Sequence, residues 1–258
     1  MKFKYTLSII LSFILALSLA SCAPKPNTGD SAESVTDAGS ERGAFYAEEV
    51  ADMGTEYIDS FIFIGESTTY HLKSRGVLNG GNDTLQVWSP KSGTINLDTT
   101  ISSLRIVYPE TGKEMTVAEA ASIKKPQRVL LTFGLNGAVQ KISRGEKYFR
   151  DCYNSLIDAV LQGSSDTRVI LQACFPIAAD MDMSNYSVDA ATLNSYVTTI
   201  NSWSAKLAQE RGLGFLNTSE ALIDENGFLK QAYHVGDGHH LTTEAYEVIL
   251  KYIRTHKA

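Results

Sequence analysis

The sequence predicts an α/β protein in which helices cover both faces of a parallel sheet. Short, continuous apolar runs alternate along the chain with longer segments of helical periodicity. Continuous apolar runs are typical of strands that are buried on both faces. The chain has 258 residues, of which 43% are hydrophobic and 20% are charged, and this suffices for one domain with a substantial core. We therefore expect a three-layer α/β/α architecture.

The first half of the domain is expected to contain two buried strands, two helices and a small hairpin insertion. The hairpin is predicted because two strand-like runs flank the turn sequence Pro109-Glu110-Thr111-Gly112. The expected elements are a short helix over 44–59, a strand over 61–64, a helix over 68–75, a strand over 84–88, hairpin strands over 104–108 and 114–117, and a helix over 117–123.

The second half repeats the alternation of strand and helix three times. The last helix is amphipathic and is capped by Thr242 or Thr243, with Glu244 in its first turn. The expected elements are strands over 128–133, 169–173 and 215–217, and helices over about 143–161, 193–207 and 242–254. The carboxyl ends of such strands form the edge at which ligands bind.

The N-terminus has the pattern of an export signal. Lys2 and Lys4 precede an apolar stretch, 5–19, that is short for a membrane span. The sequence Leu19-Ala20-Ser21-Cys22 resembles a bacterial lipoprotein box, in which Cys22 receives a lipid; a plain secretory signal or an uncleaved anchor are the alternatives. We expect a signal peptide over 1–21, a flexible tether over 22–43 and a folded domain over 44–258, lipid-anchored at the extracytoplasmic face of a bacterial cell membrane.

Charge and cysteine content narrow the remaining function classes. The net charge is −6 and no block of Lys or Arg is present, so nothing indicates a nucleic-acid partner. Cys152 and Cys174 fall at the same edge of the predicted sheet, where they form either a disulfide or two buried free thiols. Their spacing matches no metal-binding motif, and we expect no metal site.

Several polar residues and turn glycines follow the carboxyl ends of different predicted strands and should therefore meet at one edge of the sheet. Ser67 follows the strand over 61–64, Gly93 lies in the loop after 84–88, and Asn136 follows 128–133. Asp237 and His240 lie in the loop before the last helix. A serine nucleophile needs a base to take its proton, and a histidine can supply that base. An acidic residue then orients the imidazole. An amide and backbone N–H groups can stabilise an oxyanion.

These residues resemble the motifs of the SGNH, or GDSL-type, hydrolase superfamily. Its Gly-Asp-Ser block stands here as Gly65-Glu66-Ser67, its Gly-x-Asn block as Gly134-Leu135-Asn136, and its Asp-x-x-His block as Asp237-Gly238-His239-His240. The resemblance implies a flavodoxin-like parallel sheet, the catalytic residues Ser67, His240 and Asp237, and an oxyanion hole formed by Ser67, Gly93 and Asn136. It implies no metal or organic cofactor.

Glutamate at position 66 departs from the family pattern, and the histidines need to be told apart. We expect glutamate in place of aspartate at position 66 to affect the local hydrogen bonding of the turn more than the activity. Spacing from Asp237 favours His240 over His239 as the base. His71 could line the cleft, although a solvated helix position is favoured. We expect His234 and His256 at the surface.

The expected function is a serine esterase that hydrolyses carboxylic esters, with O-acetyl groups on cell-wall or extracellular polysaccharide as the preferred substrate. The alternative is a glycan-binding surface lipoprotein that has the same fold and no activity, which only Glu66 favours. A flavodoxin-like nucleotide binder is set aside because the turn after the first strand lacks the glycine pattern of a phosphate loop.

Overall fold

The structure is a computed structural model that describes residues 46–258. The expected signal peptide over 1–21, the expected lipidation site Cys22 and the expected tether over 22–43 lie outside the described residues. No helix within 46–258 is both long and apolar enough to cross a membrane.

The centre of the domain is a parallel four-stranded sheet, as the apolar runs predict. Its strand order is β2-β5-β6-β7. β2 and β5 pair over their whole length, with Ile62 opposite Val129 and Ile64 opposite Leu131. The strands are β2 (Phe61–Gly65), β5 (Arg128–Thr132), β6 (Arg168–Gln172) and β7 (Gly214–Leu216).

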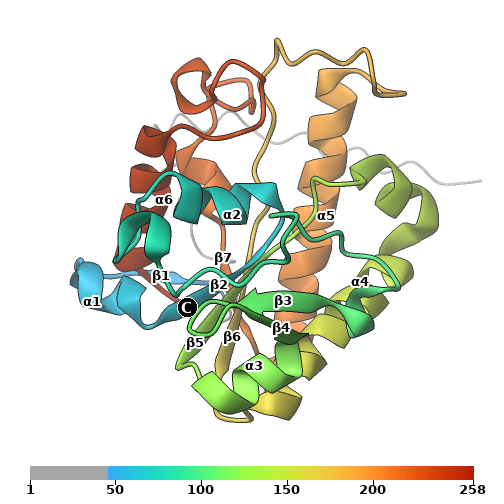
Figure 1. The fold of residues 1–258 in the computed structure, drawn as a ribbon. Coiled ribbons are helices and arrows are strands. Elements are labelled where there is room, and N and C mark those ends of the chain that lie inside the picture. Colours follow the sequence, from blue (N-terminus) through green and yellow to red (C-terminus); the bar gives the residue numbers. More distant parts are fainter. Residues whose placement is uncertain (1–45) are drawn as a thin grey trace, which may run out of the picture. The chain divides into compact units, whose positions relative to one another are not determined.

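Helices cover both faces of this sheet, which completes the three layers (Figure 1). Side chains alternate along β2: Ile62 and Ile64 join one buried cluster, whereas Phe61 and Phe63 join the other. The first cluster includes side chains from α3 (Val117–Lys124), α4 (Ala138–Gly163) and α5 (Ala190–Arg211). The second includes side chains from α1 (Gly54–Asp59), α2 (Ser67–Ser74) and α6 (Thr243–Thr255).

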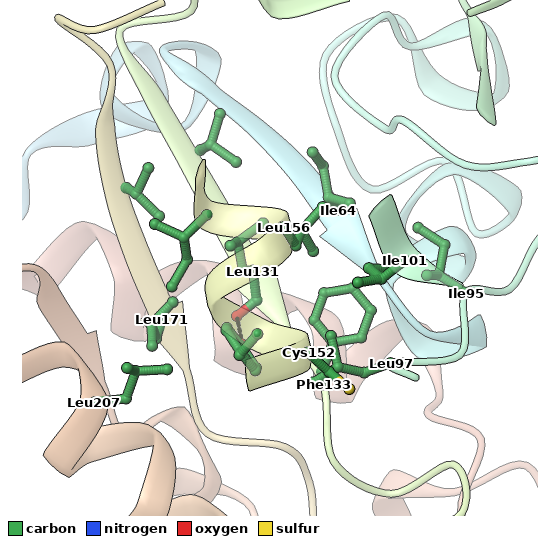
Figure 2. Packing of buried hydrophobic residues seen from close by; sticks show 14 of the residues in the cluster. Ile64, Ile95, Leu97, Ile101, Leu131, Phe133, Cys152, Leu156, Leu171 and Leu207 are labelled. Carbon is green, nitrogen blue, oxygen red and sulfur yellow. Dashed lines mark hydrogen bonds between the residues drawn. The ribbon is translucent and has the colours of Figure 1, made fainter. Parts of the chain in front are cut away.

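The first cluster is the larger core. Leu131 and Leu171 from neighbouring strands lie in one cluster with Leu156 of α4 and Leu207 of α5, and Phe133 follows the end of β5 in the same cluster (Figure 2). These five side chains are at most 1% exposed, so they are removed from water almost completely.

The predicted hairpin is present as β3 (Arg105–Tyr108) and β4 (Lys113–Thr116), paired antiparallel. Thr116 then begins α3 with a capping box, in which its side chain and that of Glu119 each accept a hydrogen bond from the other residue's backbone N–H. Thr242 caps α6 in a similar way, because its hydroxyl accepts a hydrogen bond from the N–H of Ala245.

The N-terminal part of the domain differs from the expected helix over 44–59. A two-residue strand, β1 (Glu48–Glu49), pairs antiparallel with β8 (His256–Lys257), and α1 begins only at Gly54. The N–H groups of Val50 and Met53 donate hydrogen bonds to carbonyls at the end of α6. These backbone groups are therefore used in tertiary contacts rather than in a helix.

The expected strand over 84–88 forms only a single bridge, between Val87 and Phe63, at the edge of the sheet. The side-chain amide of Gln86 donates hydrogen bonds to the carbonyls of Ile58 and Phe61. Because the Phe61 carbonyl is occupied in this way, the backbone pairing does not extend further along β2.

The expected helix over 143–161 starts earlier, at Ala138, and is interrupted at Gly145, which has φ 84° and ψ 170°. Short 3₁₀ turns complete the domain: η1 (Gly81–Asp83), η2 (Ile101–Ser103), η3 (Thr218–Ala221) and η4 (Gln231–Tyr233).

Candidate active site

Ser67 stands where β2 ends and α2 begins. A side chain at Gly65 would approach the Thr132 carbonyl to 2.6 Å, so glycine allows the end of β2 to lie against β5. Glu66 is the extended N-cap and Ser67 is the first helical residue. The Ser67 N–H therefore has no acceptor within its own helix.

The loop before α6 brings His240 to Ser67. The Nε2 atom of His240 lies 3.2 Å from the Oγ atom of Ser67, although the two residues are 173 positions apart in sequence. On the other side of the imidazole, Nδ1 of His240 lies 2.7 Å from Oδ2 of Asp237. Ser67, His240 and Asp237 thus form a continuous hydrogen-bonded chain with the order that a serine nucleophile requires.

Asp237 is held in its charged form by its own loop. Its Oδ1 atom accepts hydrogen bonds from the backbone N–H groups of His239 and His240, at 3.1 and 2.9 Å. Partial burial works against ionisation, but these backbone bonds and the His240 side chain hold the pKa of the Asp237 carboxyl well below its usual range. An Asp237 that is charged near neutral pH can stabilise an imidazolium at His240.

The structure separates the two adjacent histidines. His240 contacts Ser67, whereas Nδ1 of His239 lies 3.2 Å from the backbone carbonyl of Asp237. Burial, followed by the nearby charge of His240, lowers the pKa of His239. His239 instead lines a neighbouring cavity together with Asn136.

Asn136 follows β5, as expected, and its side-chain amide is anchored beside the loop after 84–88. Its Nδ2 atom donates to the hydroxyl of Thr94 at 3.1 Å, which uses one of its two N–H groups. The other N–H remains for a ligand. The backbone N–H of Asn136 donates to the Oε2 atom of Glu66 at 3.0 Å.

Glu66 therefore has a structural role that its sequence position did not reveal. Its side chain is buried, and its Oε1 atom accepts from the N–H of Gly134 at 2.9 Å while Oε2 accepts from Asn136. Because both oxygens accept, the carboxylate form fits the site. Burial raises the pKa of Glu66, an effect that the positive charge of Lys141 and the backbone bonds oppose.

Lys141 is the second buried charged residue at this end of the sheet. It lies in the first turn of α4 with only 4% of its surface exposed, and its ammonium group donates to the backbone carbonyl of Asn136. Glu66 and Lys141 thus hold the loop over 134–136 through its N–H groups and its carbonyl. No motif identified Lys141 as a site residue.

Gly93 does not match the expectation for an oxyanion donor. Its N–H donates to the carbonyl of Pro90 at 3.0 Å and closes a turn in which Gly93 has φ 74°. A side chain at position 93 would approach the ring of Tyr70 to 3.0 Å. The loop still reaches the site, because the next residue, Thr94, contacts Asn136.

His71 is not at the solvated helix position that was favoured. Its ring centroid lies 4.8 Å from that of His240, and its Nδ1 atom is buried with no hydrogen-bond partner in the described residues. Burial is the main cause of a lowered pKa at His71, with the charges of His240 and Arg75 contributing. A neutral His71 therefore packs against the imidazole of His240.

His234 was expected at the surface, but it is only 6% exposed. Its Nδ1 atom accepts hydrogen bonds from the N–H groups of Gly236 and Gly238, at 3.1 and 3.0 Å. These two glycines flank Asp237, so His234 shapes the turn that carries this residue. His256 is half-buried and stacks on Tyr252, with ring centroids 3.7 Å apart.

Cys152 and Cys174 are free thiols, and both are buried. Burial raises the pKa of each thiol. Among the described residues, Asp237, His239 and His240 have potential metal-ligand atoms within 4.8 Å of one another. A metal there would compete for the hydrogen bond between Asp237 and His240.

Comparison with known proteins identifies solved structures that have a similar fold. No family model and no curated protein sequence matches the chain. A solved structure from Streptococcus pneumoniae, named after platelet activating factor, is 16% identical over 78% of this chain and 88% of that one, with a TM-score of 0.54. A protein from Desulfitobacterium hafniense, assigned to the G-D-S-L family of lipolytic proteins, is 14% identical over 75% of this chain and 97% of that one, with a TM-score of 0.51.

A third similar structure is the periplasmic domain of a lipopolysaccharide acetyltransferase from Salmonella ser. Paratyphi A. It is 17% identical over 82% of this chain and 90% of that one, with a TM-score of 0.50. At these identities the similarity concerns the fold alone. The chain therefore has the α/β fold of the SGNH hydrolases, with its parallel four-stranded sheet flanked by helices.

Proposed function

We propose that this chain is a serine esterase that hydrolyses carboxylic esters. The observation that supports it most strongly is the hydrogen-bonded chain from Ser67 Oγ through His240 to Asp237, with distances of 3.2 and 2.7 Å. Ser67 Oγ attacks the ester carbonyl carbon while His240 Nε2 takes the hydroxyl proton. Asp237 fixes the imidazole with Nδ1 protonated and stabilises the imidazolium that forms.

The oxyanion that this attack creates requires donors already in place. The Ser67 N–H and the free N–H of the Asn136 side-chain amide are the proposed donors, and Glu66 and Lys141 hold the loop that carries Asn136. The oxyanion then collapses to an acyl-enzyme, and His240 gives its proton to the departing alcohol. A water molecule, deprotonated by His240, hydrolyses the acyl-enzyme.

The proposed substrate is an O-acetyl group on cell-wall or extracellular polysaccharide. Two considerations support it: the proposed lipid anchor at Cys22 would hold the domain at the extracytoplasmic face of the cell membrane, and the Salmonella domain of the same fold is named as an acetyltransferase of lipopolysaccharide. The first rests on a sequence pattern and the second on fold-level analogy.

The alternative, a glycan-binding protein without catalysis, was favoured only by Glu66. Glu66 was the only departure that suggested a degenerate site, and its carboxylate makes two hydrogen bonds to the loop that carries Asn136. Glutamate at this position therefore supports a site of the proposed geometry.

The test is hydrolysis of 4-nitrophenyl acetate by the purified protein and by its Ser67→Ala and His240→Ala variants. Ser155→Ala, which changes a serine of α4 that bonds only its own helix, is the matched control. We expect activity in the parent and the control, and a loss of about 10³-fold or more in kcat for both site variants. A fluorophosphonate should label Ser67, as mass spectrometry of the peptide would show. Equal rates in all four proteins, with no labelling, would overturn the proposal.

A further inference from the structure

A cavity of about 620 Å³ opens beside the proposed catalytic residues. Its walls come from the loop that carries Asn136, from the start of α4, and from the segment between β6 and α5, which includes Asn185 and Tyr186. His239 closes the side nearest to His240, since the two imidazole centroids are 3.9 Å apart. The volume lies within the range of small-ligand pockets, roughly 300–1,000 Å³.

The cavity is polar but uncharged, since none of its lining residues is Asp, Glu, Lys or Arg. Four lining residues carry carboxamides: Asn96, Asn136, Gln140 and Asn185. Each carboxamide both donates and accepts hydrogen bonds, as sugar hydroxyl groups do.

Most of this hydrogen-bonding capacity is available to a ligand. Within residues 46–258, the side chains of Asn96, Gln140 and Asn185 make no hydrogen bond to another protein group. Tyr186 adds an aromatic ring that is 40% exposed, an unusual exposure for a large apolar side chain in this domain. An aromatic ring with a hydroxyl group suits a ligand that has both apolar C–H faces and polar edges.

The position of the cavity indicates that it would hold the alcohol part of the ester rather than the acyl part. In the proposed reaction, His240 returns its proton to the departing alcohol oxygen, so the alcohol must lie next to the imidazole. The cavity lies there, between His239 and the proposed oxyanion donor Asn136. The small acyl group would remain at Ser67, outside this space.

We infer that this cavity binds an uncharged sugar unit, the alcohol part of the ester, between the carboxamides and the ring of Tyr186. The assignment of the cavity to the alcohol part of the ester rests on the proposed esterase function. The choice of an uncharged sugar rests on the lining residues alone. It excludes glycans whose sugar at this position carries a carboxylate, because no cationic side chain lines the cavity.

The first experiment measures binding without chemistry. Unacetylated xylotetraose, cellotetraose, chitotetraose and tetragalacturonate are titrated into the purified protein and followed by calorimetry or protein NMR. We expect saturable binding of at least one neutral tetrasaccharide, with the anionic tetragalacturonate at least tenfold weaker. Tyr186→Ala should weaken the neutral ligand at least fivefold, whereas Ile123→Ala should not. Ile123 is the matched control because it is also an exposed large apolar side chain, at 59%, and lies near the end of α3, outside the cavity.

The second experiment measures kinetics on the acetylated form of the bound tetrasaccharide. Tyr186→Ala should raise KM about as much as it weakens binding, with a much smaller effect on kcat. Binding without hydrolysis of any ester would keep the sugar site and overturn the esterase proposal. Hydrolysis of small aryl acetates without saturable binding of a neutral tetrasaccharide would overturn the sugar site and keep the esterase. Unchanged binding in Tyr186→Ala, or tighter binding of tetragalacturonate, would also overturn it.

Discussion

Replacing Glu66 by glutamine tests how the loop that carries Asn136 is held. Glutamine has nearly the same size but keeps only one acceptor oxygen, so its NH₂ group must face the N–H of Gly134 or of Asn136. A buried donor left without a partner costs about 1–3 kcal/mol. The buried ammonium of Lys141 also loses the favourable charge of Glu66, which acts on it without a direct ion pair between the two side chains.

These two costs overlap, because both disturb the same loop. We therefore expect the free energy of unfolding of Glu66→Gln to fall by about 1–3 kcal/mol. The amide of Asn136 should shift with its backbone. Since losing an oxyanion donor costs about 10²–10³ in kcat, a displaced donor should cost about 10- to 100-fold.

The assay combines urea unfolding with hydrolysis of 4-nitrophenyl acetate, for Glu66→Gln, Lys141→Met and the double variant. Removing Lys141 should rescue part of the stability lost in Glu66→Gln, because the buried positive charge that Glu66 no longer offsets is then absent. Glu244→Gln, at an exposed glutamate of α6, is the control and should stay within about 0.5 kcal/mol of the parent. Equal stability of Glu66→Gln and Glu244→Gln, or strictly additive effects in the double variant, would refute the reasoning.

Three further predictions concern the same edge of the sheet. Asn136→Ala should lower kcat for aryl acetate by about 10²–10³-fold with little change in KM, and an unchanged kcat would remove Asn136 from the proposed oxyanion hole. His234→Ala leaves the N–H groups of Gly236 and Gly238 without their acceptor; urea unfolding should show a loss of about 1–3 kcal/mol, and a loss below 0.5 would contradict this role. The lowered pKa of Asp237 means that its charge stabilises the fold above about pH 5 and that this contribution fades as the pH falls below about 4. Asp237→Asn should therefore be destabilised at pH 7, with a smaller deficit at pH 3, and a deficit that grows toward low pH would contradict the assignment.

Much of the architecture could be predicted because it depends on local patterns. The continuous apolar run from Phe61 to Ile64 identifies a strand buried on both faces, and β2 has that position. Thr116 and Glu119 form a capping box that starts a helix whatever surrounds it. The secondary-structure predictions were wrong where backbone groups form hydrogen bonds with distant parts of the domain. The segment before Gly54 is extended because its N–H groups donate to carbonyls at the end of α6.

The sequence by itself determined the order of the four strands of the parallel sheet and of the helices that follow them, the edge of the sheet at which polar residues gather, and the pairing of Asp237 with His240 across three positions. Spacing along one turn decides that pairing. Only the tertiary structure decided the roles of residues that act across long separations. Glu66 bonds a loop about 70 positions away, Lys141 supports that loop from α4, and His71 packs on His240. His234, four positions before Gly238, is close in sequence, but its burial depends on the surrounding fold. A buried charge or an inward-facing histidine has no local signature, because its partners are chosen by the packing of distant segments.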